Sequence, residues 1–184
     1  MKLFHLSDLH IGKRVHEFSM IEDQKYMLTQ ILQAVMREKP DGVLISGDVY
    51  DRTIPTAEAV QVLDAFLTSL SEQEVPVFII SGNHDSAARL NCFRSILSRQ
   101  NVYMIGTPPT TEEEYIEKVT LQDAYGDLHF YLLPFVKPGY VRKLFDEEIK
   151  GYDMAVRRLI EREEIDPARR CVILSHQFYT AGGK

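Results

Sequence analysis

Short apolar runs alternate with longer segments of helical periodicity over the first hundred residues of the chain. The runs at 3–6, 43–45 and 77–80 are mostly aliphatic, which is typical of strands buried on both faces of a sheet. After each run, apolar residues recur at helical spacing, over residues 17–38, 56–73 and 87–99. This strand and helix alternation predicts a parallel sheet with right-handed crossovers.

The pattern changes after a further strand predicted at 102–105. Segments 115–121 and 128–133 flank the turn Tyr125-Gly126-Asp127, which predicts an antiparallel hairpin. A charged helical stretch at 139–164 then leads to a last predicted strand at 171–175. We therefore expect an α/β fold.

Length and composition allow one domain with a real core, since the chain has 184 residues and 45% hydrophobic content. Its apolar runs are far shorter than the ~20 residues of a membrane span, so we expect no membrane association and a cytoplasmic location. Cys92 and Cys171 have no metal-type spacing, and we expect both to be ordinary buried thiols. The formal net charge of −6 is unlike that of a protein that coats DNA, although basic residues near the expected site leave DNA binding open.

Polar side chains follow three of the predicted parallel strands. They are Asp8 and His10 after the first, Asp48 after the second, and Asn83 and His84 after the third. Because the carboxyl ends of parallel strands meet at one edge of a sheet, these side chains should converge there. That grouping predicts a metal centre.

The donor types favour divalent ions. In an extended chain Asp8 and His10 point the same way while Leu9 turns into the core. A carboxylate oxygen with an imidazole nitrogen suits manganese, iron or zinc. Asp48 offers two oxygens and can bridge two ions roughly 3.5–4 Å apart, and Asn83 adds a neutral oxygen ligand.

His84 directly follows a predicted ligand, so we expect its imidazole to face the substrate and either to protonate a leaving oxygen or to stabilise the charge of a pentacoordinate phosphorus. Asp51 is the candidate that holds His84 in one tautomer, and Arg52 is a planar fork suited to phosphate oxygens. The alternative for both residues is that they cap the next segment.

His176 ends the last predicted strand, and we interpret it as a further metal ligand, with a local hydrogen bond as the alternative. Asp85 is expected to support its loop or cap the following helix. We expect His5 to be buried or to support the ligands rather than to bind metal.

Together the motifs Asp-x-His, Gly-Asp-x-x-Asp, Gly-Asn-His-Asp and a strand-terminal His resemble the calcineurin-like metallophosphoesterase superfamily, in order from residue 2 to residue 178. The segments at 6–12, 132–135 and 175–178 are similar to SbcD-type DNA repair exonuclease subunits. The resemblance implies two packed mixed β-sheets flanked by helices, a four-layer sandwich.

It also implies two divalent ions, foremost Mn²⁺ with Mg²⁺, Fe²⁺ or Zn²⁺ as alternatives, and cleavage of DNA at ends and hairpins in repair and recombination. The implied partners are DNA, an SbcC-type ATPase of coiled-coil architecture, and a second copy of the chain that pairs through the second and third helices. On those helices the candidate interface residues are Leu67, Leu70, Leu90 and Leu97. Two other functions stay open: a phosphoesterase acting on a small ester or phosphoprotein, and a scaffold without catalysis, against which His84 argues.

The sequence departs from the family in one respect. Members carry a Gly-His-x-His segment after the position of His176, and none occurs in this sequence. We expect residues 1–184 to be a metallophosphoesterase (nuclease) domain truncated before its last metal-ligand motif and without a capping domain, the alternative being a site that is incomplete by design. We also expect this fragment to bind metal weakly and to have little or no nuclease activity.

Overall fold

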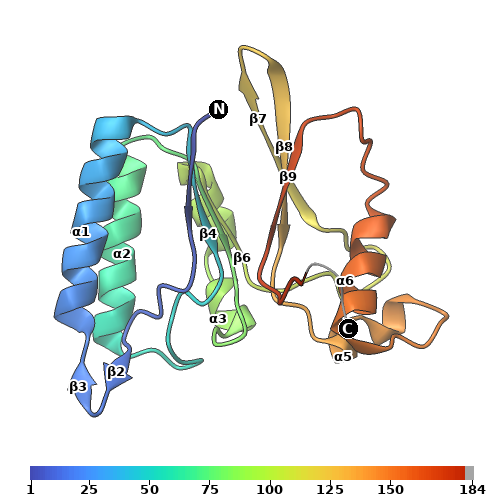
Figure 1. Cartoon of the computed structure of the whole chain (residues 1–184), viewed down its shortest axis with the longest axis horizontal. Helices are drawn as coiled ribbons and strands as arrows, with labels where there is room; N and C mark the ends of the chain where they lie inside the picture. Colours follow the sequence, from blue (N-terminus) through green and yellow to red (C-terminus); the bar gives the residue numbers. More distant parts are fainter. Residues whose placement is uncertain (181–184) are drawn as a thin grey trace.

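The computed structural model describes residues 1–180 and arranges them in four layers (Figure 1). Two β-sheets stack face to face in the middle, and helices cover the outer face of each. This order of layers confirms the predicted α/β sandwich. None of the helices in the described part is long and apolar enough to cross a membrane.

The first sheet is parallel throughout, in the order β1 (Leu3–Leu6), β4 (Gly42–Ser46), β5 (Val77–Ile80) and β6 (Val102–Ile105). Every residue of β4 and β5 is buried. Alternate side chains explain this burial, because Val43 and Ile45 belong to the core under the helices while Leu44 belongs to the core between the sheets. The expectation of two mixed sheets is therefore wrong for this sheet.

Helices α1 (Ile21–Glu38) and α2 (Ala57–Glu72) lie side by side over the outer face of the first sheet (Figure 1). α2 begins at a cap in which the hydroxyl of Thr56 accepts a hydrogen bond from the Ala59 N–H. α1 begins four residues later than predicted, because the hairpin of β2 (Arg14–Val15) and β3 (Phe18–Ser19) precedes it.

Three leucines considered for an interface between two copies of the chain lie in the core. Leu67, Leu70 and Leu90 are 8%, 0% and 3% exposed, and Leu97 packs against the same cluster. The apolar stripes that carry these leucines are the faces that cover the sheet, so they are not available to a second copy. The assignment of Leu67, Leu70 and Leu90 to an interface is therefore wrong, whereas Leu97 is only partly buried.

The helix predicted at residues 87–99 is broken into three pieces: α3 (Ala87–Leu90), α4 (Arg94–Leu97) and the 3-10 turn η1 (Ser98–Gln100). Phe93, with a φ of +62°, stands at the N-cap of α4 and so separates the first two pieces. Side-chain bonds fix the break, since the amide of Asn91 accepts from the Gly106 N–H and donates to the Thr107 hydroxyl. These tertiary contacts override the local helical pattern.

The second sheet is mixed. β7 (Glu117–Asp123) and β8 (Gly126–Leu133) form the predicted antiparallel hairpin, and β9 (Cys171–Ser175) pairs with β8 in parallel. The two sheets meet through aromatic packing, because the rings of Phe78 and Phe130 stack with centroids 4.4 Å apart. The carboxyl end of β9 comes close to that of β4, since His176, just after β9, bonds the carbonyl of Ser46, the last residue of β4.

The outer face of the second sheet is covered by α6 (Gly151–Arg162), preceded by α5 (Pro138–Val141) and the turn η2 (Arg142–Leu144). The continuous helix expected at 139–164 is thus interrupted, with Phe145 in an extended conformation. The expectation that both cysteines are buried is also wrong, since Cys92 and Cys171 are exposed free thiols.

Candidate metal centre

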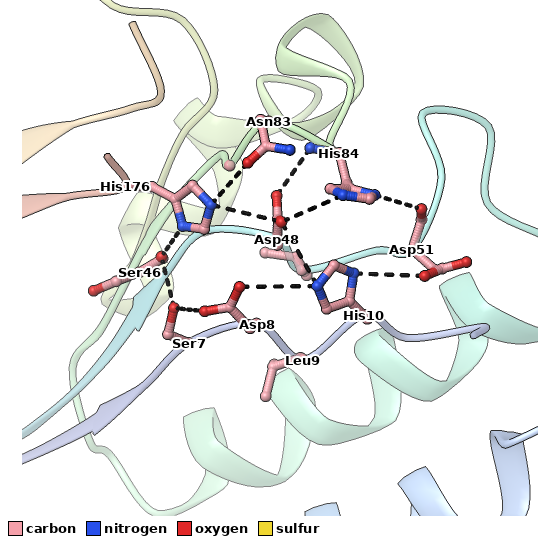
Figure 2. Close-up of polar contacts among 12 residues, drawn as sticks. Ser7, Asp8, Leu9, His10, Ser46, Asp48, Asp51, Asn83, His84 and His176 are labelled. Carbon is pink, nitrogen blue, oxygen red and sulfur yellow. Dashed lines mark hydrogen bonds and ion pairs between the residues drawn. The ribbon is translucent and has the colours of Figure 1, made fainter. Parts of the chain in front are cut away.

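The predicted ligands meet where strands of both sheets end (Figure 2). Asp8 and His10 follow β1, Asp48 follows β4, and Asn83 and His84 follow β5; His176 arrives from β9 of the second sheet. Backbone bonds align the first two loops, from the Asp8 N–H to the Gly47 carbonyl (3.1 Å) and from the His10 N–H to the Asp48 carbonyl (2.9 Å). The residues line one cavity of about 450 Å³.

Three of these residues have a left-handed backbone. The φ angles of Asp8, His10 and Asp48 are +55°, +44° and +48°. Leu9 between the first two is buried, as expected, but the extended geometry predicted for Asp8 and His10 is wrong. Non-glycine residues in this region cost of order 1–3 kcal/mol each and persist only where the surroundings hold them.

Asp48 is the residue shared by the two groups of metal donors. His10, Asp48 and His84 form one group, and Asp8, Asp48 and His176 form the other, with all ligand atoms of each group within 4.8 Å of one another. Asp48 Oδ2 lies 3.6 Å from His10 Nε2 and 3.5 Å from His176 Nε2. The side chain of Asp48 is 4% exposed, and within residues 1–180 no lysine or arginine pairs with it. Asp48 Oδ1 accepts a hydrogen bond from the His84 N–H at 2.9 Å, while Oδ2 faces imidazole nitrogens. A buried carboxylate among imidazoles fits divalent ions.

His176 is held with its Nε2 toward the other donors. Its Nδ1 bonds the backbone carbonyl of Ser46 at 2.7 Å, which requires the proton on Nδ1 and leaves Nε2 free to bind metal. His176 Nε2 also lies 3.2 Å from the amide oxygen of Asn83. The neutral oxygen predicted at position 83 is therefore next to the second donor group.

Asp51 contacts both of the other imidazoles, but with different atoms. Its backbone carbonyl accepts from Nδ1 of His84 at 3.1 Å, while its carboxylate faces Nδ1 of His10 at 3.5 Å. Asp51 therefore does contact His84 as predicted, and it does so through its backbone carbonyl rather than its side chain. Both contacts leave an imidazole Nε2 facing Asp48.

Arg52 does not reach the centre. Its side chain is 69% exposed, and its guanidinium lies 3.8 Å from the Asp51 carboxylate. It is absent from the residues that line the cavity in the described part of the chain.

Asp85 fastens the loops that follow β4 and β5. Its two carboxylate oxygens accept hydrogen bonds from the backbone N–H groups of Val49 (3.0 Å), Tyr50 (2.9 Å) and Gly82 (2.9 Å). Burial raises the pKa of Asp85, against the lowering effect of these three donors. Asp85 was predicted either to support its loop or to cap the following helix, and these bonds confirm the support of the loop.

Two glycines allow the close approach of these loops. A Cβ at Gly47, where φ is +88°, would lie 2.5 Å from Nδ1 of His176. A Cβ at Gly82 would overlap the carboxylate and the backbone nitrogen of Asp48. Both glycines are therefore required by packing against predicted ligands.

Sequence reasoning missed Gln24 and Ser46. The buried amide of Gln24 donates to the carbonyls of Leu9 and His10 and accepts from the Gly12 N–H, so it ties the first loop to α1. The signal was present, because Gln24 is a polar residue on the apolar stripe of its helix. Ser46 carries the carbonyl that orients His176, and a backbone carbonyl has no sequence signal.

His5 contributes from the edge strand. Its side chain is exposed rather than buried, and its Nε2 bonds the hydroxyl of Ser46 at 2.8 Å. It lies in the lining of the same cavity. His5 therefore bonds Ser46, whose carbonyl orients the predicted ligand His176. This agrees with the expectation that His5 supports the ligands, and not with the expectation that it is buried.

Comparisons with known proteins agree with this geometry. A family model described as calcineurin-like phosphoesterase matches residues 1–181. The chain is 34% identical over 188 residues to a protein of Staphylococcus epidermidis that is named as the D component of the nuclease SbcCD, covering all of this chain and 48% of that protein. It is 31% identical over 180 residues to the protein of the same name from Staphylococcus saprophyticus, covering 96% of this chain and 46% of that protein. The chain thus spans about half the length of these curated relatives.

Proposed function

Because this chain belongs to the calcineurin-like phosphoesterase family, we propose that it is the nuclease part of an SbcCD-type complex, a metal-dependent hydrolase of DNA phosphodiester bonds at ends and hairpins in repair and recombination. The observation that carries the proposal is the buried Asp48, which is common to two groups of donors. One carboxylate between two groups is the arrangement that a two-metal phosphodiesterase needs.

We propose two divalent ions at this centre. His10 and Asp48 would hold one ion, and Asp8, Asp48 and His176, with Asn83 nearby, would hold the other. His84 lies beside the first position and is reserved for the proton step. The mixture of carboxylate oxygen and imidazole nitrogen suits Mn²⁺, Fe²⁺ or Zn²⁺, and Mg²⁺ less well. Mn²⁺ is proposed first because of the resemblance to SbcD-type nucleases. Bound ions supply Lewis acidity toward a phosphodiester held in the cavity.

His84 is proposed as the proton donor. Its side chain is 47% exposed, against 16% for His10 and 14% for His176, so it is the most accessible to substrate of the three imidazoles. Its Nε2 is also the most distant from Asp48, at 4.0 Å. With Nδ1–H bonded to the Asp51 carbonyl, a proton taken up on Nε2 is the one that can pass to a leaving oxygen.

The test of His84 separates catalysis from metal binding. In the natural protein, His84→Ala should lower the manganese-dependent rate of DNA cleavage by about 10²- to 10⁴-fold, while calorimetry still detects Mn²⁺ binding. His16→Ala is the matched control, because His16 lies exposed in the β2–β3 hairpin, outside the residues that line the cavity. Unchanged cleavage by His84→Ala would contradict the proposed role.

The substrate class is tested on the same protein. Manganese-dependent hydrolysis should be compared among DNA, cyclic nucleotides and phosphoserine peptides. DNA that stays intact while a small ester or a phosphopeptide is consumed would refute the nuclease proposal and leave the phosphoesterase chemistry standing.

We further propose an SbcC-type ATPase as partner, from the names of the relatives, and a homodimer that pairs through the second and third helical segments. The large apolar residues left exposed in the third segment are Phe93 (74%) and Ile96 (62%), and these replace the buried leucines as interface candidates. Sedimentation equilibrium should give twice the mass of one chain for the wild type and a lower mass for Phe93→Ser. A wild-type protein that is monomeric at tens of micromolar would refute the dimer.

A further inference from the structure

A second cavity of about 560 Å³ adjoins the metal centre. The two cavities share lining residues, namely Asn83, Phe135, Gln177 and Phe178. The volume lies within the range of sites that bind small organic groups, about 300–1,000 Å³. A molecule held at the metal centre can therefore extend into this second cavity without leaving the protein surface.

Four of the nine residues that line this cavity are aromatic, namely Phe135, Tyr152, Phe178 and Tyr179. Phe135 is in the middle, with its ring centroid 6.3 Å from that of His176 on one side and 6.0 Å from that of Tyr152 on the other. Tyr152 is 53% exposed and Tyr179 is 65% exposed. Such open rings beside a site for phosphodiester chemistry offer flat apolar surface that the metal centre itself does not use.

The rings are held in place by neighbouring contacts. The hydroxyl of Tyr179 is within 2.7 Å of the hydroxyl of Ser175, the last residue of β9. Tyr152 is in the first turn of α6, and the buried Val156 one turn later forms part of the floor of the cavity. The part of the surface made by Phe135, Tyr152 and Tyr179 is therefore positioned before any ligand arrives, which limits the ordering cost of binding, whereas Phe178 is 97% exposed.

Polar groups at the rim suit a nucleotide. Lys137 lines the cavity and is exposed, so its ammonium is available to a phosphate oxygen. Gln177 donates its amide hydrogen to the Val136 carbonyl at 3.2 Å, which leaves its amide oxygen to accept from a base edge. Among residues 1–180, Asp153 is the acidic residue of the lining, and it is paired with Arg157 at 2.9 Å, which offsets its repulsion of phosphate.

We propose that this aromatic cavity binds an unpaired nucleobase, that of the nucleotide next to the phosphate held at the metal centre. A nucleobase is a flat aromatic group linked to a phosphate, so it matches both the rings and the shared lining. A paired base within a duplex presents only its edge and cannot stack on these rings. The inference rests on the proposed function and adds to it that the nucleotide beside the cut is unpaired.

Base binding is tested first without metal. Single-stranded oligonucleotides with 2-aminopurine at successive positions are titrated with the natural protein in EDTA, and stacking is measured as fluorescence quenching. Tyr152→Ala should weaken binding about tenfold, as expected for the loss of one stacking partner, and Tyr152→Phe should restore it. The matched control is Tyr125→Ala, because Tyr125 is 84% exposed at the β7–β8 turn. No quenching by the wild type, or equal binding by Tyr152→Ala, would overturn the inference.

The second measurement separates this inference from the proposed function. With Mn²⁺, hydrolysis of the p-nitrophenyl ester of thymidine 5′-phosphate is compared with that of methyl p-nitrophenyl phosphate, which has no base. The wild type should prefer the thymidine ester about tenfold in kcat/KM, and Tyr152→Ala should lose that preference while its rate on the methyl ester is unchanged. A preference that survives in Tyr152→Ala overturns the base site alone. Failure to hydrolyse either ester counts against the metal-centre proposal, and the fluorescence result then decides the base site.

Discussion

Replacing Asp85 with alanine removes one carboxylate and leaves three backbone donors, those of Val49, Tyr50 and Gly82, without their partners. Hydrogen bonds to a charged group contribute about 1.5–3 kcal/mol each, so the three sum to roughly 4.5–9 kcal/mol. The desolvation that raises the pKa of Asp85 opposes this sum. We therefore expect Asp85→Ala to lower the free energy of unfolding by about 4 kcal/mol at pH 7.

Urea denaturation followed by circular dichroism measures this loss, with EDTA present so that ions do not contribute to stability. Asp127→Ala is the control, because Asp127 is exposed in the β7–β8 hairpin and should change stability by less than about 0.5 kcal/mol. Repeating the denaturation with Mn²⁺ tests the link to the site, since the loops that Asp85 fastens carry Asp48 and Asn83. Stabilisation of the wild type by Mn²⁺ should exceed that of Asp85→Ala. A loss below about 1 kcal/mol in EDTA would refute the role assigned to Asp85.

Two further predictions use other contacts. Gly82→Ala should destabilise the protein by about 3 kcal/mol and abolish manganese binding in calorimetry, because its Cβ would overlap Asp48; an alanine variant that binds Mn²⁺ normally would contradict the packing argument. Asp123 pairs with Arg170 and with the amino terminus, and these contacts lower the pKa of its carboxyl. Because the folded-state pKa lies below the unfolded one, the stabilisation is complete above about pH 4 and is lost as the pH falls toward the lowered pKa. The difference in urea midpoint between wild type and Asp123→Asn should therefore be constant from pH 5 to 8 and shrink below pH 4, and a difference that persists unchanged at pH 2.5 would exclude this explanation.

The sequence was sufficient to predict that the metal donors gather at one site, because parallel strands bring their carboxyl ends to one edge, but not that Arg52 stays outside it. Asp8, Asp48 and Asn83 lie there together with His176, as expected. It was not sufficient to predict their backbone conformations, which depend on bonds between loops, such as that from the Asp8 N–H to the Gly47 carbonyl. Local spacing carries no information about such bonds.

The role of Asp51 shows a second limit. A residue has two kinds of acceptor, the side-chain carboxylate and the backbone carbonyl, and the sequence distinguishes only the first. At Asp51 the carbonyl contacts His84 and the carboxylate contacts His10. The helix break at Phe93 is similar in origin, because it depends on bonds made by Asn91 to residues far along the chain. At Asp51 and at Asn91 alike, the contact that decides the structure is made to a residue distant in the sequence.

The left-handed conformations of Asp8, His10 and Asp48 have a consequence for redesign of this chain. Glycine adopts that region without a steric penalty, so a design procedure that scores only the metal-free fold would choose glycine at all three positions. Each such choice would relax the loop and delete a donor atom. Thermostabilised versions of this chain must therefore be selected with the ions present, because selection for the apoprotein alone favours the loss of its chemistry.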